Sequence, residues 1–111
     1  MLSILRNRDY PSRPWKNGGG TTRDILASPP GASLDEFDWR LSLAQVDRDG
    51  PFSRFDNVER TLVLLSGAMT LHEQGRRIDL VRHQPFVFAG ERAIEATVAS
   101  GATLDFNVMC A

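Results

Sequence analysis

The amino-acid sequence predicts an all-β domain, a small antiparallel barrel or sandwich, on two observations. Apolar residues recur mostly in short runs with a period of two, which is typical of strands that bury one face. Turn-forming residues separate these runs at close intervals, and this favours an antiparallel fold over an alternating βαβ fold. The best helical candidate is a short turn over residues 34–37, which the hydroxyl of Ser33 can cap.

The predicted strands differ in how much of each strand is apolar. The run over residues 61–65 is continuously apolar, as expected for a strand that is buried on both faces. Gln74 and Gly75 separate two alternating segments and predict a hairpin with a tight turn. The predicted strands are residues 39–44, 61–65, 69–73, 76–81, 86–88, 94–98 and 104–109.

Composition excludes several classes of protein. A chain of 111 residues fits one domain, and 13 basic against 14 acidic residues exclude a broad nucleic-acid-binding surface, which needs a basic excess. The single cysteine, Cys110, excludes an internal disulfide and a cysteine-based zinc site. The apolar start at residues 1–5 is too short for a signal peptide, and no run is long enough to span a bilayer. We therefore expect a cytoplasmic protein with no nucleic-acid and no membrane partner.

The final alternating segment, residues 104–109, runs to within two residues of the chain end without a turn signal. Two interpretations follow. The segment is an edge strand of the sheet, or the chain is a piece of a longer protein. We favour the second, because chain ends usually carry some frayed polar residues.

The most distinctive local feature is a glycine-rich segment over residues 14–23, which contains three consecutive glycines. Such glycines indicate a positive φ or a close approach of two backbones. Backbone N–H groups in such a loop can bind an anion, and Lys16 (the only lysine) and Arg23 supply charge beside it. The segment lacks the Gly-Lys-Ser/Thr ending of a nucleotide-binding loop. The alternative is a flexible turn that Trp15 anchors by packing.

Polar residues occupy one face of three predicted strands. Arg40 and Ser42 share a face of one strand, Arg60 opens the most apolar strand, and Asp105 and Asn107 share a face of the last. These faces are either solvated outer surfaces or, in a small barrel, an interior that forms a ligand pocket. Arginine suits a carboxylate ligand, since its planar fork donates two parallel hydrogen bonds.

Catalytic and metal-binding patterns are weak in this sequence. His72 and His83 lack the partner spacing of a mononuclear metal site, and we expect surface histidines, no metal and no cofactor. No Gly-x-Ser-x-Gly motif is present, so a nucleophilic triad has no support. Asp79 with either histidine can form an acid–base dyad only if the fold brings them together.

Several sequence blocks, taken in order along the chain, resemble the HutD/Ves family. The first block is the glycine-rich segment, Pro-Trp-Lys-Asn-Gly-Gly-Gly-Thr-Thr-Arg, and the match extends over nearly the whole chain. The blocks are residues 14–23, 37–42, 49–55, 60–67, 88–90 and 104–109.

The resemblance implies a cupin-type (RmlC-like) β-barrel and a bacterial protein associated with histidine utilisation. Members of the family are regarded as regulatory proteins that bind a small molecule, with a carboxylate intermediate such as N-formylglutamate or urocanate as the suspected ligand. The histidine cluster of metal-binding cupins is absent here. Family members continue beyond this length, so we expect residues 1–111 to be a single cupin-like domain from the N-terminal part of a longer protein.

We therefore expect a metal-free cupin that senses a small carboxylate, with no catalytic residue and with a possible homodimer. Two alternatives stay open. One is a cupin-fold enzyme, an isomerase or hydrolase acting on a related acid, and the other is a structural protein that docks a partner of the same pathway. The expected ligand-binding residues are Trp15, Lys16, Asn17, Arg23, Arg40, Ser42, Arg60 and Asn107.

Overall fold

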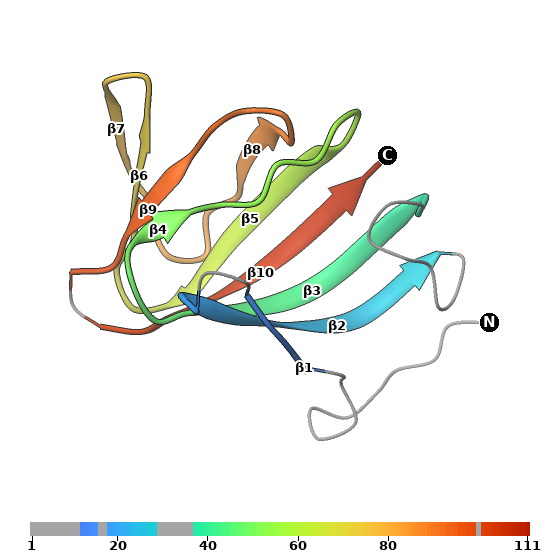
Figure 1. Cartoon of the computed structure of the whole chain (residues 1–111), viewed down its shortest axis with the longest axis horizontal. Helices are drawn as coiled ribbons and strands as arrows, with labels where there is room; N and C mark the ends of the chain where they lie inside the picture. The colour runs from blue at the N-terminus through green and yellow to red at the C-terminus, as the bar shows by residue number, and fades with distance from the viewer. Residues whose placement is uncertain (1–11, 16–17, 29–36, 100) are drawn as a thin grey trace.

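The described part of the chain forms ten β-strands in two antiparallel sheets (Figure 1). The computed structural model describes residues 12–15, 18–28, 37–99 and 101–111. The strands are β1 (Ser12–Pro14), β2 (Gly20–Ser28), β3 (Trp39–Val46), β4 (Gly50–Pro51), β5 (Glu59–Ser66), β6 (Thr70–Glu73), β7 (Arg76–Asp79), β8 (Phe86–Ala89), β9 (Glu95–Thr97) and β10 (Thr103–Cys110).

The larger sheet has the strand order β1-β2-β3-β10-β5-β8, and the smaller sheet has the order β4-β9-β6-β7. In Figure 1 the smaller sheet lies over the end of the larger sheet at which β10 begins. Strand β10 pairs with β3 on one side and with β5 on the other along almost its whole length. The last strand is therefore central, and the interpretation that it forms a sheet edge is wrong.

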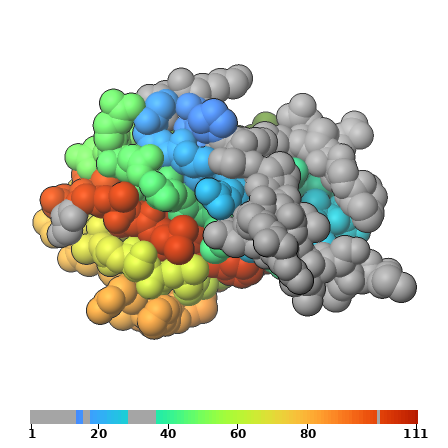
Figure 2. All heavy atoms as spheres, turned by 90° about the horizontal axis from the view of Figure 1, so that it is seen from below, coloured from blue at the N-terminus to red at the C-terminus, as the bar shows by residue number. Residues whose placement is uncertain are grey.

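The register of the central strands decides which side chains share a face. Asn107 on β10 lies opposite Ser42 on β3 and Leu62 on β5, and all three side chains are buried on the inner face. The alternating apolar residues of β3 and β10 point to the other face and are only half-buried. Figure 2 views the molecule from below, where β10 (red) lies beside β5 (yellow-green).

The apolar core lies between the two sheets. Leu62 and Leu64 from β5 pack with Leu71 from β6, and each of these side chains is at most 1 % exposed. Burial of one such side chain contributes about 1.5–3 kcal/mol to the free energy of unfolding. The remaining buried members of this cluster are Val46, Met69, Phe88, Ile94, Ala96 and Val98.

The predicted hairpin is confirmed. Strands β6 and β7 pair in register from Thr70 opposite Asp79 to Glu73 opposite Arg76. Gln74 and Gly75 have φ values of 46° and 80°. A two-residue hairpin turn of type I′ requires a positive φ at both of these positions. Strand β5 is also present, but its side chains alternate between buried and half-buried, so the expectation of two fully buried faces is wrong.

Three strands, β1, β2 and β4, have no counterpart among the strands predicted from the sequence. Strand β2 shows no apolar alternation, and its side chains beyond Gly20 are uniformly half-buried. The two-residue strand β4 lies where only a turn was expected. The predicted helical turn over residues 34–37 lies outside the described residues apart from Phe37, which belongs to no helix. Within the described ranges, no helix is long and apolar enough to cross a membrane.

Candidate functional site

The glycine-rich segment is a tight connection into β2. Gly18 has a φ of 71°, and a Cβ atom on Gly20 would lie 2.5 Å from the carbonyl oxygen of Gln45. The prediction that these glycines provide a positive φ and a close backbone approach is therefore confirmed. The two polar residues predicted from this segment, Lys16 and Asn17, lie outside the described residues.

Trp15 is half-buried and links this segment to the interior. Its indole Nε1 donates a hydrogen bond to Oγ1 of Thr22 at 2.7 Å. Its ring meets the ring of Phe52 edge-on, with 6.4 Å between the centroids. Phe52 in turn packs on Arg60, so Trp15 supports the aromatic surroundings of this arginine.

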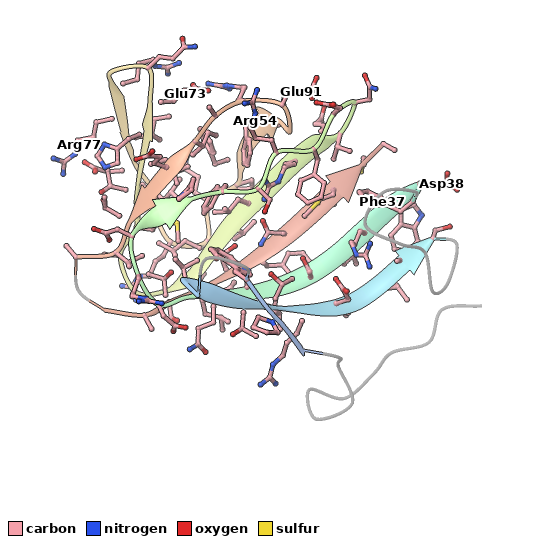
Figure 3. All side chains as sticks on the ribbon, in the orientation of Figure 1. Phe37, Asp38, Arg54, Glu73, Arg77 and Glu91 are labelled. Atoms are coloured by element: carbon pink, nitrogen blue, oxygen red, sulfur yellow. The ribbon has the colours of Figure 1, made fainter. Side chains whose placement is uncertain are left out.

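Two predicted arginines occupy one row across the larger sheet. Met109 on β10 lies opposite Arg40 on β3 and Arg60 on β5, so the two arginines share one face of the sheet with one strand between them. Both arginines are buried, and each lies against an aromatic ring. Figure 3 shows Phe37, the ring that Arg40 contacts, at the end of the sheet where β3 begins. The polar face of these strands is thus an interior surface rather than a solvated one.

Arg40 already forms an ion pair with a carboxylate. Its Nε and Nη2 donate hydrogen bonds to the two carboxylate oxygens of Asp24 on β2, at 3.0 and 3.2 Å. Asp24 lies opposite Ser42 in the register of β2 and β3, which brings it to the inner face. This pair shows the side-on geometry by which an arginine holds a carboxylate.

Arg60 is surrounded by aromatic rings. Its guanidinium carbon lies 4.9 Å from the ring centroid of Phe88, 5.4 Å from that of Phe55 and 5.7 Å from that of Phe52. Its Nη1 donates a hydrogen bond to the backbone oxygen of Ser53 at 2.9 Å. Its buried Nε has no hydrogen-bond partner among the described residues. Burial lowers the pKa of Arg60 to about 10, so the group is cationic at neutral pH.

Asp105 is the second buried charge with an unpaired atom. Its side chain is 2 % exposed, and its Oδ2 accepts a hydrogen bond from Nδ2 of Asn107 at 2.5 Å. Its Oδ1, like the hydroxyl of Thr103 on the same face, has no partner within the described part of the chain. Burial raises the pKa of Asp105 to about 7, although Asn107 and Arg60 oppose this rise. The sequence places Asp105 on this strand face, but Asp105 is not among the ligand-binding residues expected from it.

The structure gathers some of the predicted site residues and separates others. Ser42 and Asn107 lie opposite each other on the inner face, in the row next to Arg40 and Arg60. Arg23 lies opposite Leu43 and therefore on the outer face of the sheet. Arg23 therefore does not belong to the interior cluster, which consists of Arg40, Ser42, Arg60, Asp105 and Asn107.

No hydrogen bond joins Asp79 to either histidine in the described part of the chain. Oδ1 of Asp79 accepts hydrogen bonds from Thr70 and Arg77, whereas Nε2 of His72 lies 3.2 Å from Oγ1 of Thr97. His83 lies on an exposed loop with a φ of 69°. In the described part of the chain, no group of three or more His, Cys, Asp or Glu residues could hold a metal ion.

The interior cluster is suited to binding an anion. Arginine presents Nε and Nη2 along one edge, and the Nε of Arg60 lacks a partner in a largely apolar environment. Hydrogen bonds between charged groups are strong in such surroundings, and an unpaired buried donor is costly. A carboxylate at the Nε and Nη2 edge of Arg60 would accept a hydrogen bond from Nε and neutralise the charge of the guanidinium group.

Comparisons with known proteins agree on a family. The HutD family model matches residues 7–111. An uncharacterized 21.2 kDa protein in the hutC 3′ region of Pseudomonas putida is 40% identical over all of this chain and 59% of its own length. Protein Ves of Citrobacter koseri is 40% identical over 92% of this chain and 54% of its own length. The chain therefore spans between half and three fifths of the length of these curated relatives.

Solved structures show the same relation. HutD from Pseudomonas fluorescens superposes with a TM-score of 0.89 at 35% identity, over 98% of this chain and 60% of its own. More distant structures share only the fold. They include KdgF from a Halomonas species (TM-score 0.75, 14% identity) and a cupin domain of a transcriptional regulator from Enterobacter cloacae (TM-score 0.67, 12% identity). The chain has the cupin fold and belongs to the HutD family.

Proposed function

We propose that this chain is the carboxylate-binding part of a regulatory protein in histidine utilisation. The ligand is a pathway intermediate such as N-formylglutamate or urocanate, and it is bound without a metal ion. The carboxylate lies along the Nε and Nη2 edge of Arg60, in the geometry by which Asp24 lies along Arg40.

One observation carries this proposal, the incomplete hydrogen bonding of Arg60. Nη1 is held by Ser53 and the guanidinium is confined by three phenylalanine rings, while the buried Nε has no partner among the described residues. The group is thus oriented in advance of binding, which lowers the entropic cost of holding a ligand. The name of the Pseudomonas putida relative, which places that protein beside hutC, supports the pathway.

Isothermal titration calorimetry with N-formylglutamate, urocanate and histidine at pH 6.5 tests the proposal. Substitution Arg60→Lys keeps the positive charge but removes the planar edge that donates two hydrogen bonds. We expect at least one of the two acids to bind, and the Arg60→Lys variant to bind it about tenfold to a hundredfold more weakly, the equivalent of one hydrogen bond to a charged group.

The matched control is Arg77→Lys on the hairpin of β6 and β7. The Arg77 side chain is 70 % exposed, and Figure 3 shows it at the opposite end of the molecule from Phe37. Its substitution makes the same chemical change away from the site and should leave affinity unchanged. Equal affinities of the wild-type protein and the Arg60→Lys variant would overturn the assignment of Arg60.

A further inference from the structure

The inner face of the larger sheet holds a balanced set of charges. The described residues contribute two cations, Arg40 and Arg60, and two anions, Asp24 and Asp105. Arg40 and Asp24 are joined by two hydrogen bonds. Arg60 and Asp105 are not joined, although each acts on the charge of the other through space.

The register explains why Arg60 and Asp105 interact without contact. Arg60 lies opposite Met109, four residues along β10 from Asp105. Four residues of extended strand span about 13 Å between Cα atoms. This separation keeps the two groups from pairing, and each retains an atom that has no partner in the described part of the chain, Nε of Arg60 and Oδ1 of Asp105.

A carboxylate ligand disturbs this balance. If it binds at Arg60 while Asp105 is ionised, the interior holds two negative charges beside one positive charge. An uncompensated buried charge is costly, and protonation of one carboxylate removes it. The ligand contacts the guanidinium directly and stays ionised, so the proton goes to Asp105.

We propose that Asp105 takes up one proton when a carboxylate binds at Arg60, so that the ligand replaces Asp105 as the counter-charge of the arginine. This inference rests on the proposed function and adds a regulation of the same site by pH. The protonated Asp105 becomes a hydrogen-bond donor, so the site favours anions that also present an acceptor oxygen toward β10. Burial has already raised the pKa of Asp105 to about 7, so the uptake is accessible near neutral pH.

The other charged groups that face this interior are already paired. Arg40 and Asp24 hold each other from β3 and β2. The buried Glu73 on β6 of the smaller sheet is bound by Arg92, and this pairing lowers the pKa of Glu73 so that it stays ionised. Arg60, with a pKa of about 10, stays largely cationic up to pH 9, so among the described residues of the inner face Asp105 is the group whose charge changes most between pH 6 and 9.

The test measures affinity for formate and N-formylglutamate by calorimetry from pH 6 to 9. The carboxyl groups of both probes stay ionised throughout this range. We expect the dissociation constant of the wild-type protein to rise by up to about tenfold per pH unit above pH 7. The reason is that each further pH unit lowers the fraction of protein with a protonated Asp105 about tenfold. Titrations at pH 7.5 in triethanolamine and in Tris, two cationic buffers that differ in ionisation enthalpy, should show net proton uptake on binding.

Asp105→Asn imitates the protonated acid without titrating. The variant should bind both probes at pH 6 with an affinity similar to that of the wild-type protein, and bind them at pH 9 at least tenfold more tightly than the wild-type protein. Asp79→Asn makes the same change at an exposed position on β7 and should retain the pH dependence of the wild-type protein.

The outcomes separate the two proposals. Binding by the wild-type protein with a pH-independent affinity and no proton uptake overturns the role of Asp105 and leaves the proposed function standing. Failure of the wild-type protein and of the Asp105→Asn variant to bind either probe at pH 6 overturns the proposed function itself. The buffer comparison uses only the wild-type protein, so a variant that folds poorly does not prevent the decision.

Discussion

The buried carboxyl group of Asp105 makes the stability of this protein depend on pH in an unusual direction. Its pKa is raised from an ordinary value of 3.8 to about 7 in the folded protein, chiefly by burial. A group with a raised pKa binds its proton more tightly in the folded state, so its contribution is complete in acid and is lost as pH rises through 7. Most buried carboxylates with a cationic neighbour show the opposite trend.

The magnitude follows from the two pKa values. At pH 5 the group is protonated when folded and ionised when unfolded, and at pH 8 it is ionised in both states. Each pKa unit corresponds to about 1.4 kcal/mol, so about 2.5 kcal/mol of the free energy of unfolding is lost between pH 5 and pH 8. Asp105→Asn removes the titration while keeping the shape of the side chain, and the amide oxygen still accepts the hydrogen bond from Asn107.

The assay is urea unfolding of the wild-type protein and of the Asp105→Asn variant at pH 5, 6, 7 and 8. Tryptophan fluorescence reports on both states through Trp15 and Trp39. Because the two proteins differ only at this position, the difference between their stability curves isolates Asp105. We expect the variant to gain about 2.5 kcal/mol relative to the wild-type protein over this range. If the free energies of unfolding of the two proteins differ by the same amount, within about 0.5 kcal/mol, at all four pH values, burial does not raise the pKa of Asp105 and the reasoning is refuted.

Three other substitutions test local packing and hydrogen bonding. Gly20→Ala places a methyl group 2.5 Å from the carbonyl oxygen of Gln45, and we expect a loss of about 1–3 kcal/mol in urea unfolding. Gly75→Ala, where no atom lies within 4 Å of the added Cβ, should lose only about 1 kcal/mol through its positive φ; equal losses would contradict the steric explanation. Thr103→Val removes a buried hydroxyl that has no partner in the described structure, and should leave thermal stability unchanged or raise it by about 1 kcal/mol. A lower melting temperature would mean that this hydroxyl has a partner.

Much of the fold could be predicted because strand signals are local. The alternation over residues 94–98 and the turn at Gln74 and Gly75 depend only on neighbouring residues, and both are present in the structure. Strand β2 could not be predicted in this way, since it is held by its pairing with β3 and carries no apolar alternation. The pairing partner of each strand is likewise a long-range property.

The site was predictable in part. The sequence identified Arg40, Ser42, Arg60 and Asn107 as polar residues of strand faces, and the structure brings them to adjacent rows of one inner surface. It did not indicate that Asp24 engages Arg40, because the two residues are 16 positions apart on strands whose register only the folded sheet defines. An acidic residue on a strand next to a polar arginine face is the signal that could have suggested the pair.

The sequence by itself determined that β3 and β10 alternate between a polar and an apolar face, and that the glycine-rich segment needs its glycines. It did not determine which face is buried, because a period of two separates the sides of a strand without orienting them. The tertiary structure turned the polar faces inward, where Asp24 balances Arg40 and aromatic rings enclose Arg60. The apolar faces were left half-buried on the outside. That orientation depends on strand register and on the second sheet, and both are contacts between residues far apart in the chain.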